Sequence, residues 1–304
     1  MTPALLAAIH DLEFVARVTV EGALAGLHRS PFHGYSAEFS QYRHYRPGDD
    51  LKYIDWKLFA RTDRIYTKQY RETTNMVAGI AVDASASMGF RGRTGVSKIA
   101  YARLLAAALA YLVSRQGDAV GLAVYGDGVR DYLPGRTGPS HLRRLLVALT
   151  RLEASGGTAA AGSLARAIDL LRRRGLLVIV SDLYDEDAAV ERELARAARI
   201  GHEVAVFHVL SRDEIDFPYG GGQRDVELED LETGRVVLTS PRSAGPAYRR
   251  DVAEFLERWR ARAAKYGIDY TRAVTDMPLD ATLRGYLLKR RASGSGPGGS
   301  REHR

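Results

Sequence analysis

Apolar runs, uninterrupted at 76–82 and 176–180, alternate with segments of helical periodicity from residue 75 onward. The runs that predict strands are 76–82, 119–125, 176–180, 204–210 and 268–274, with 129–133 as a hairpin partner of the second. The segments that predict helices are 98–115, 141–151, 163–173, 188–198, 246–266 and 279–289. Strands that are apolar on both faces are typical of a parallel sheet covered by helices on both sides. The pattern therefore predicts a Rossmann-like α/β domain over residues 75–290 with a mostly parallel sheet.

The rest of the chain has a different pattern. Residues 1–26 predict one helix, because apolar side chains recur at helical spacing from Leu5 to Leu24. Residues 27–74 are rich in aromatic residues and turn signals, which predicts a small β-rich attachment. A further hairpin is expected at about 224–239, belonging to that attachment or lying beside it. Residues 291–304 are rich in glycine and serine, as is typical of a disordered basic tail.

Composition narrows the class of protein. The chain has 304 residues, of which 45% are hydrophobic and 27% are charged, as in ordinary globular proteins. It contains no cysteine, which excludes disulfides, thiolate chemistry and cysteine-ligated metals. It shows neither a signal peptide nor an apolar stretch long enough to span a bilayer. We therefore expect a cytoplasmic protein with no membrane span.

The net charge of +7 is concentrated near one end of the chain. The residues that supply +4 of it are Lys289, Arg290, Arg291, Arg301 and Arg304, less Glu302. The body of the protein is therefore only mildly basic, and nucleic acid is an unlikely partner.

The aromatic segment 42–71 permits two interpretations. Its tyrosines and Trp56 could stack on bases between arginines such as Arg43 and Arg64, which would make it a nucleic-acid-binding surface. Alternatively, Arg46 and Arg61 pair with nearby aspartates while the aromatic rings pack against the sheet. From residue 42 to residue 75 there are eight Lys or Arg residues against five Asp or Glu residues. This near balance favours the structural interpretation, with nucleic-acid binding as the alternative.

Oxygen-bearing side chains follow the predicted strands where they end. Asp83, Ser85 and Ser87 follow the run 76–82, Asp182 follows the run 176–180, and Thr158 lies in a glycine-containing loop before a helix. Carboxyl ends of parallel strands meet at one edge of a sheet, where α/β proteins bind ligands. A set of two carboxylates and three hydroxyls suits a hard divalent cation, Mg²⁺ before Ca²⁺ or Mn²⁺. Taken alone, Ser87 could instead cap a helix, the loop that contains Thr158 could start one, and Asp182 could be the N-cap of the helix that follows.

These residues carry a resemblance to a known family. Asp83, Ser85, Ser87, Thr158 and Asp182 resemble the metal-ion-dependent adhesion site of a von Willebrand factor A domain. More specifically, the chain resembles the DUF58 family of bacterial proteins. The further motifs that carry this resemblance are the segment 37–72, which contains YRPGDD and IDW, the stretch LLVIVSDLYD, and DEIDFPY at 213–219. The chain departs from many relatives at Ala159, where they have an acidic residue, and at its N-terminus, where larger relatives have membrane helices.

The resemblance implies an A-type α/β domain with a small β-rich N-terminal attachment. It also implies association with a MoxR-type AAA+ ATPase, as an adaptor in chaperone-like assembly or metal insertion. In such a site the five residues hold the cation, and a partner protein presents a Glu or Asp carboxylate to it.

Enzymatic motifs are missing from the sequence. Ser85 stands where a phosphatase of D-x-D type has its second carboxylate, and neither a GxSxG elbow nor a P-loop motif occurs. We therefore expect a binding module and not an enzyme. Because the strand would turn alternate side chains apart, we also expect Ser181 to point away from the site.

Overall fold

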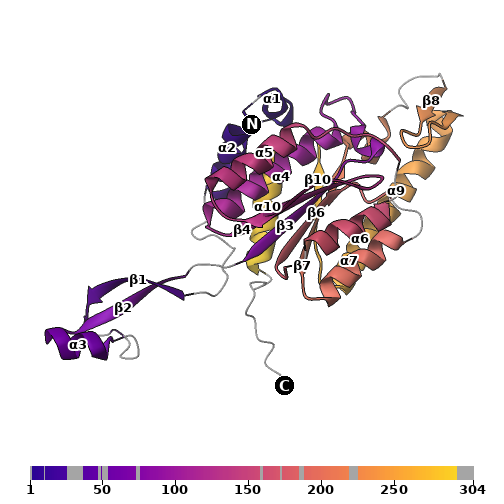
Figure 1. Ribbon diagram of the computed structural model, residues 1–304. Coiled ribbons are helices and arrows are strands. Elements are labelled where there is room, and N and C mark those ends of the chain that lie inside the picture. Colours follow the sequence, from indigo (N-terminus) through magenta and orange to yellow (C-terminus); the bar gives the residue numbers. More distant parts are fainter. Residues whose placement is uncertain are drawn as a thin grey trace.

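A six-stranded sheet forms the centre of the computed structural model (Figure 1). The structure describes residues 2–9, 11–25, 37–46, 49, 54–72, 76–157, 160–171, 173–184, 188–218 and 225–292. Across the sheet the strands are β10 (Asp269–Val274), β7 (Glu203–Leu210), β6 (Leu176–Ser181), β3 (Val77–Asp83), β4 (Ala119–Tyr125) and β5 (Val129–Arg136). All neighbouring strands are parallel except β4 and β5, the predicted hairpin. In chain order this is the doubly wound arrangement 6-5-4-1-2-3, which confirms the predicted fold class.

Helices cover both faces of the sheet, as the apolar strands predicted. One layer consists of α1 (Pro3–Ala7), α2 (Leu12–Leu24), α4 (Lys98–Arg115), α5 (Pro139–Thr150) and α10 (Leu279–Ala292). The other consists of α6 (Ala160–Leu170), α7 (Ala189–Arg199) and α9 (Pro241–Lys265). Each face of the sheet has its own hydrophobic core; β3 contributes Ile80 and Val82 to the first and Ala81 to the second. No helix in the described part of the chain is long and apolar enough to cross a membrane.

The N-terminal region differs from the single helix predicted for residues 1–26. It forms two helices, and Asp11 begins the second by accepting a hydrogen bond from the backbone N–H of Phe14 at 2.9 Å. A capping carboxylate satisfies an otherwise unpaired N–H, which favours a helix start at this point. Leu6, Val15 and Val20 are buried in the first hydrophobic core. These helices are therefore part of the α/β domain and not a separate unit.

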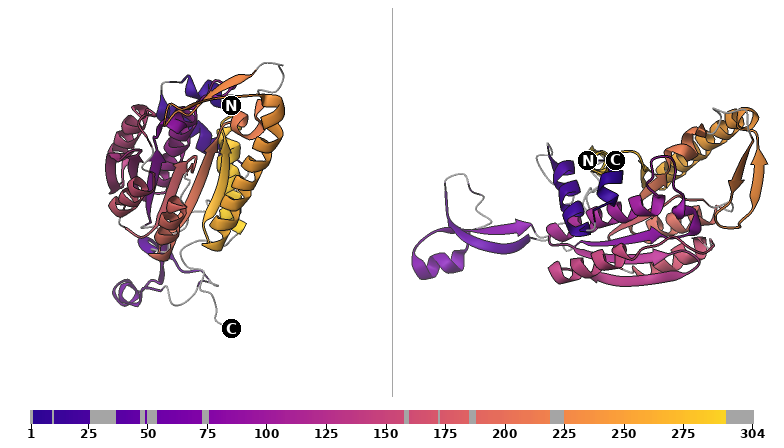
Figure 2. Two further views of the ribbon diagram at one scale, coloured as in Figure 1. Left: turned by 90° about the vertical axis from the view of Figure 1, so that its right-hand side faces the viewer. Right: turned by 90° about the horizontal axis from the view of Figure 1, so that it is seen from above.

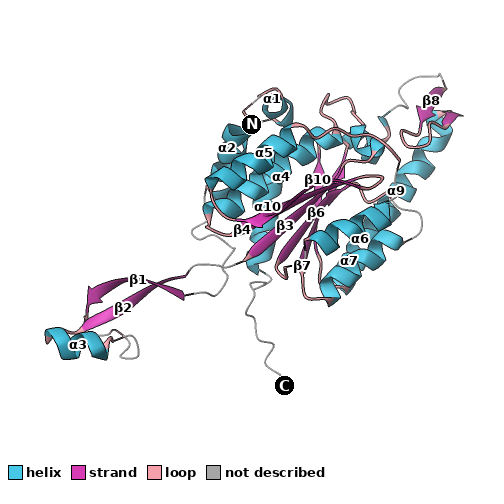
Figure 3. Ribbon diagram, in the orientation of Figure 1, coloured by secondary structure: helices cyan, strands magenta, loops and turns pink. Residues whose placement is uncertain are grey.

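Residues 37–72, called the arm below, project away from the α/β domain (Figures 1 and 2). The arm is an antiparallel pair, β1 (Ala37–His44) and β2 (Tyr66–Glu72), with the unpredicted helix α3 (Trp56–Thr62) between the strands (Figure 3). Trp56 is 59% exposed and Tyr42 is 43% exposed, so the prediction that these rings pack against the sheet is wrong.

The second hairpin and the tail also differ in position from the prediction. Strands β8 (Val226–Glu229) and β9 (Val236–Thr239) form the expected hairpin, but it lies beside α9 at the end of the molecule opposite the arm (Figure 1). The short helix α8 (Arg212–Asp216) precedes it. Helix α10 continues to Ala292, so Arg291 and Ala292, predicted to lie in the tail, are helical, and Arg290 is buried and bonded to Glu203. The remainder of the predicted tail lies outside the described residues.

The buried imidazole of His208 makes the stability of this core depend on pH. Its Nδ1 lies 2.7 Å from the Tyr270 hydroxyl, and burial lowers its pKa from 6.5 to about 4. The unfolded chain therefore takes up a proton at a higher pH than the folded protein does. The stability that this group contributes is complete above pH 6.5 and is lost as the pH falls toward 4.

We predict that His208 accounts for about 2 kcal/mol of the stability lost between pH 7 and pH 5. The measurement is urea unfolding of the wild type and of His208→Gln at both pH values. The variant should show a smaller difference between the two. An equal difference in both proteins would contradict the prediction.

Candidate functional site

The candidate site lies where the strand order reverses, between β3 and β6. Asp83 is the last residue of β3, and Asp182 follows the last residue of β6. The crevice outside the carboxyl ends of two such strands is the usual ligand position in an open α/β sheet.

The loop after β3 brings its carboxylate and hydroxyls together. Asp83 Oδ1 accepts a hydrogen bond from the backbone N–H of Ser85 at 2.9 Å, which turns the chain just after the strand. A short 3₁₀ helix (Ala86–Gly89) follows, and the Oγ atoms of Ser85 and Ser87 lie 3.1 Å apart. The predicted convergence of these three side chains is therefore present in the fold.

Asp182 joins this group from β6. The Ser87 hydroxyl is near enough to its carboxylate to help lower the pKa of Asp182, and both aspartates are almost fully buried. Burial raises the pKa of Asp83 to about 6, and the negative charge of Asp182 adds to the rise. The two carboxylates are thus close enough to influence one another.

Ser181 belongs to the site, contrary to the expectation that it would point away. Its hydroxyl donates to Asp83 Oδ2 at 2.7 Å and accepts from the backbone N–H of Leu183 at 3.0 Å. The reason is the strand register: Val82 pairs with Val180, so the next residues, Asp83 and Ser181, are neighbours on the same face. Both oxygens of Asp83 are therefore engaged inside the protein.

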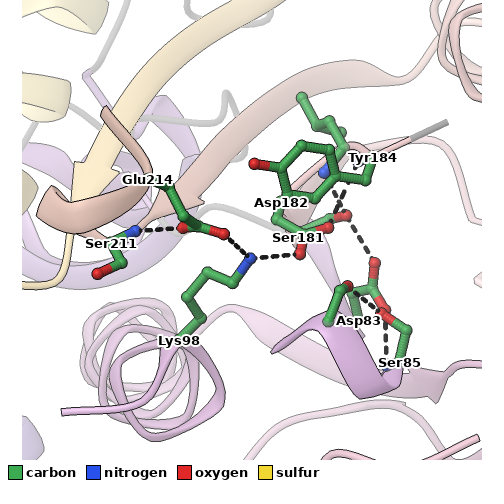
Figure 4. Close-up of polar contacts among 10 residues, drawn as sticks. Asp83, Ser85, Lys98, Ser181, Asp182, Tyr184, Ser211 and Glu214 are labelled. Carbon is green, nitrogen blue, oxygen red and sulfur yellow. Dashed lines mark hydrogen bonds and ion pairs between the residues drawn. The ribbon is translucent and has the colours of Figure 1, made fainter. Parts of the chain in front are cut away.

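Lys98 completes the polar cluster and was not predicted from the sequence. Its Nζ lies 2.7 Å from Asp182 Oδ2 and 2.6 Å from Glu214 Oε1, and the side chain is 1% exposed (Figure 4). Burial alone would lower the pKa of Lys98, but the charges of Asp182 and Glu214 outweigh burial and raise it. Likewise, burial would raise the pKa of Asp182, but the Lys98 ammonium outweighs burial and lowers it. One sequence signal existed: Lys98 is the first residue of α4, where a positive charge opposes the helix dipole.

Glu214 is held in place by the start of α8. Ser211 and Glu214 form a capping box, in which Glu214 Oε2 accepts from the backbone N–H of Ser211 at 2.6 Å. The neighbouring Asp213 accepts from the backbone N–H of Arg93 at 2.7 Å and fixes the loop before α4. The sequence motif that begins at Asp213 therefore orients Lys98 in two ways. Glu214 binds its ammonium, and Asp213 fixes the loop before the helix that carries it.

Arg130 joins the loops around the site. Its Nη1 donates to the carbonyl of Ala84 and to the Ser155 hydroxyl, both at 2.9 Å, and its Nη2 donates to the Ser155 carbonyl at 2.6 Å. Gly156 lies in this junction at φ +69°, and a Cβ atom there would meet the side chains of Asp127 and Arg130. A glycine is therefore required at this point of the loop.

Thr158, the fifth predicted ligand, lies outside the described residues. The loop that leads to it is in place, since the backbone N–H of Ala86 donates to the carbonyl of Gly156 at 3.1 Å. The chain thus approaches Ser85 and Ser87 two residues before Thr158.

The described donor atoms suit a hard cation better than a soft one. No group of three or more His, Cys, Asp or Glu side chains placed to hold a metal occurs within the described residues. The site consists of two carboxylates with hydroxyl oxygens, and adjacent oxygens around Mg²⁺ at bonds of about 2.1 Å lie about 3 Å apart. The separation of the two serine Oγ atoms is close to this value.

A cleft of about 880 Å³ adjoins the cluster. The wall of the cleft nearest the candidate site contains Ser87, Lys98 and Glu214. The residues on its other sides are Phe90, Tyr184, Ala188, Phe255, Arg258 and Arg262, with the β8–β9 turn at 229–233. The cleft therefore leads to one side of the cluster.

Comparisons with known proteins give the family. The family model described as "Protein of unknown function DUF58" matches residues 41–261. An uncharacterized protein of Mycobacterium tuberculosis is 34% identical over 268 residues, which cover 86% of this chain and 81% of the relative. An uncharacterized protein of Mycobacterium bovis matches with the same identity and the same coverage.

Similar solved structures are more distant in sequence. BatB from Bacteroides thetaiotaomicron is 18% identical with a TM-score of 0.47, over 71% of this chain and 99% of that one. The SpRpn10 VWA domain is 11% identical with a TM-score of 0.41, over 69% of this chain and 94% of that one. On the match of the family model and of the mycobacterial relatives, this chain belongs to the DUF58 family.

Proposed function

We propose that this protein is a non-enzymatic adaptor that binds a partner protein through a divalent cation. The cation is Mg²⁺, or alternatively Ca²⁺ or Mn²⁺, held by Asp83, Ser85, Ser87, Thr158 and Asp182. The observation that carries the proposal is the convergence of four of these residues at the reversal of strand order, with two hydroxyl oxygens 3.1 Å apart.

The bonding of the aspartates supports a site that accepts an outside ligand. Both Asp83 oxygens accept hydrogen bonds from the protein, and one Asp182 oxygen is bonded to Lys98. These carboxylates would act on the cation mainly through water, whereas the uncharged hydroxyls would ligate it directly. A cation with little negative charge in its first shell keeps its attraction for an added carboxylate. A Glu or Asp side chain of a partner, entering by the cleft, would supply that carboxylate.

The partner we propose is a MoxR-type AAA+ ATPase, in chaperone-like assembly or metal insertion. This chain has no P-loop motif, so the energy for such work would come from the partner. We place this activity in the cytoplasm, where such an ATPase finds ATP.

Replacing Asp83 tests whether the cluster binds a cation. We predict that Asp83→Ala lowers Mg²⁺ affinity at least about tenfold, as measured by calorimetric titration, and Ser181→Ala about tenfold because Ser181 orients Asp83. The melting temperature without metal should not fall in Asp83→Ala, since burial already disfavours this carboxylate. Ser114→Ala, at the opposite end of α4, is the matched control and should bind Mg²⁺ as the wild type does. Equal affinity in all four proteins would exclude a cation site at Asp83.

Partner capture tests the adaptor function separately. We predict that a pull-down from source-cell lysate recovers a AAA+ ATPase in Mg²⁺, and that EDTA or Asp83→Ala removes it. The physical reason is that the partner's carboxylate would bond to the cation. Without the cation, the carboxylate would have no equivalent group to bond to. Recovery of the same ATPase in all conditions would make the protein a metal-independent scaffold.

Exposure of the arm favours a second candidate function, nucleic-acid binding through residues 42–71. Trp56 is 59% exposed, and Lys57, Arg61 and Arg64 are exposed beside it. None of these three cations forms an ion pair with another described residue. Exposed rings between exposed cations are the arrangement by which single strands are bound.

We expect binding to single-stranded DNA or RNA to be weak, salt-sensitive and lost when residues 291–304, which contain Arg291, Arg301 and Arg304, are removed. Such binding would reflect the basic tail alone. The measurement is fluorescence anisotropy over a salt series with the full chain, the truncated chain and Trp56→Ala. Tight binding that survives truncation but not Trp56→Ala would replace the adaptor proposal by nucleic-acid binding.

A further inference from the structure

Lys98 introduces a permanent positive charge into the candidate cation site. It is almost fully buried, and its ammonium bonds one carboxylate of the site, Asp182, and one outside it, Glu214. Among the described residues, no other basic side chain bonds Asp83, Asp182 or Glu214. An ammonium in direct contact with a carboxylate that serves a divalent cation must repel that cation.

The surroundings of Lys98 leave it little freedom to bind a ligand itself. Two of its N–H groups point to carboxylates, and its Nζ lies 5.0 Å from the centre of the Tyr184 ring and 6.0 Å from that of Phe90. The capping box at Ser211 fixes Glu214, and Glu214 in turn fixes the ammonium. Lys98 therefore acts on a ligand by its charge, through Asp182, and not by contact.

The net charge of this cluster depends on Lys98. Asp83, Asp182 and Glu214 against Lys98 leave two negative charges, which one divalent cation neutralises. Without Lys98 the same loaded cluster would keep one negative charge. A negatively charged, buried cluster repels an incoming carboxylate, and a neutral one does not.

We propose that Lys98 sets the balance of this site between metal and anion: its charge weakens cation binding and permits the loaded site to accept a carboxylate. The inference rests on the proposed function, since it requires a cation at Asp83 and Asp182. The preference of the loaded site for an anionic partner group then depends on Lys98, which is not one of the five ligands.

The test separates two effects of opposite sign in Lys98→Met. Mn²⁺ affinity is measured by electron paramagnetic resonance of the free ion. Carboxylate binding is measured by the water proton relaxation of the Mn²⁺-loaded protein, titrated with sodium acetate against sodium chloride at equal ionic strength. We expect Mn²⁺ to bind at least about tenfold more tightly and acetate about tenfold more weakly than in the wild type. A lysine that only supported the fold would weaken both.

A second variant keeps the test informative if Lys98→Met does not fold. Glu214→Gln removes a negative charge and keeps the lysine, so Mn²⁺ should bind more weakly and acetate more tightly. Lys265→Met, at the far end of α9, is the matched charge control and should change neither. If the wild type binds no Mn²⁺, the proposed function fails and this inference fails with it. If the wild type binds Mn²⁺ but the variants shift both affinities together, or leave either unchanged, only this inference is overturned.

Discussion

The buried ion pair between Lys98 and Asp182 is the interaction on which the carboxyl edge of the sheet depends. Both side chains are almost excluded from water, and a buried charge persists only with a partner at bonding distance. Removing one member of such a pair typically costs about 3–5 kcal/mol, because the other charge is left uncompensated. Lys98 also opposes the dipole of α4, so its carboxylate partners are what stabilise it at that position. The end of β6, the start of α4 and the start of α8 are thereby held in one arrangement.

The loops around this pair are fixed by hydrogen bonds to the backbone. Arg130 binds carbonyls of the loops after β3 and before α6, and Asp213 binds the loop that precedes α4. Side chains held by such bonds lose little entropy when a ligand arrives, which favours binding by a few well-placed groups. Residues that are far apart in the chain are thereby held together at this edge of the sheet.

The two projecting hairpins contrast with this rigid centre. The arm has exposed rings and a helix, α3, with no buried side chain, and a two-stranded unit of this kind is marginally stable by itself. The β8–β9 hairpin, at the opposite end, contributes its turn to the cleft beside the candidate site. Only this second hairpin is placed to influence what reaches Lys98 and Ser87. The two hairpins therefore lie in different environments, one projecting from the domain and one beside the cleft.

The sequence by itself determined the sheet, its helices and the local half of the site. Runs such as 76–82 and 176–180 predict β3 and β6 because burial on both faces leaves an apolar residue at every position. Asp83, Ser85 and Ser87 could also be found from the sequence, because their contacts span only two residues. The break at Asp11 was missed because helical periodicity continues across it, although a local cap ends one helix and begins another.

Only the tertiary structure decided which distant groups join that local half. Lys98 meets Asp182 across 84 positions and Glu214 across 116, and no periodicity in the sequence encodes such a separation. Ser181 faces Asp83 because of the register between β3 and β6, which hydrogen bonding along the whole ladder sets. The opposite positions of the arm and of the β8–β9 hairpin follow from the course of the chain around the sheet. Composition and spacing therefore identify the donor atoms, whereas the packing of helices on the sheet determines the charge that surrounds them.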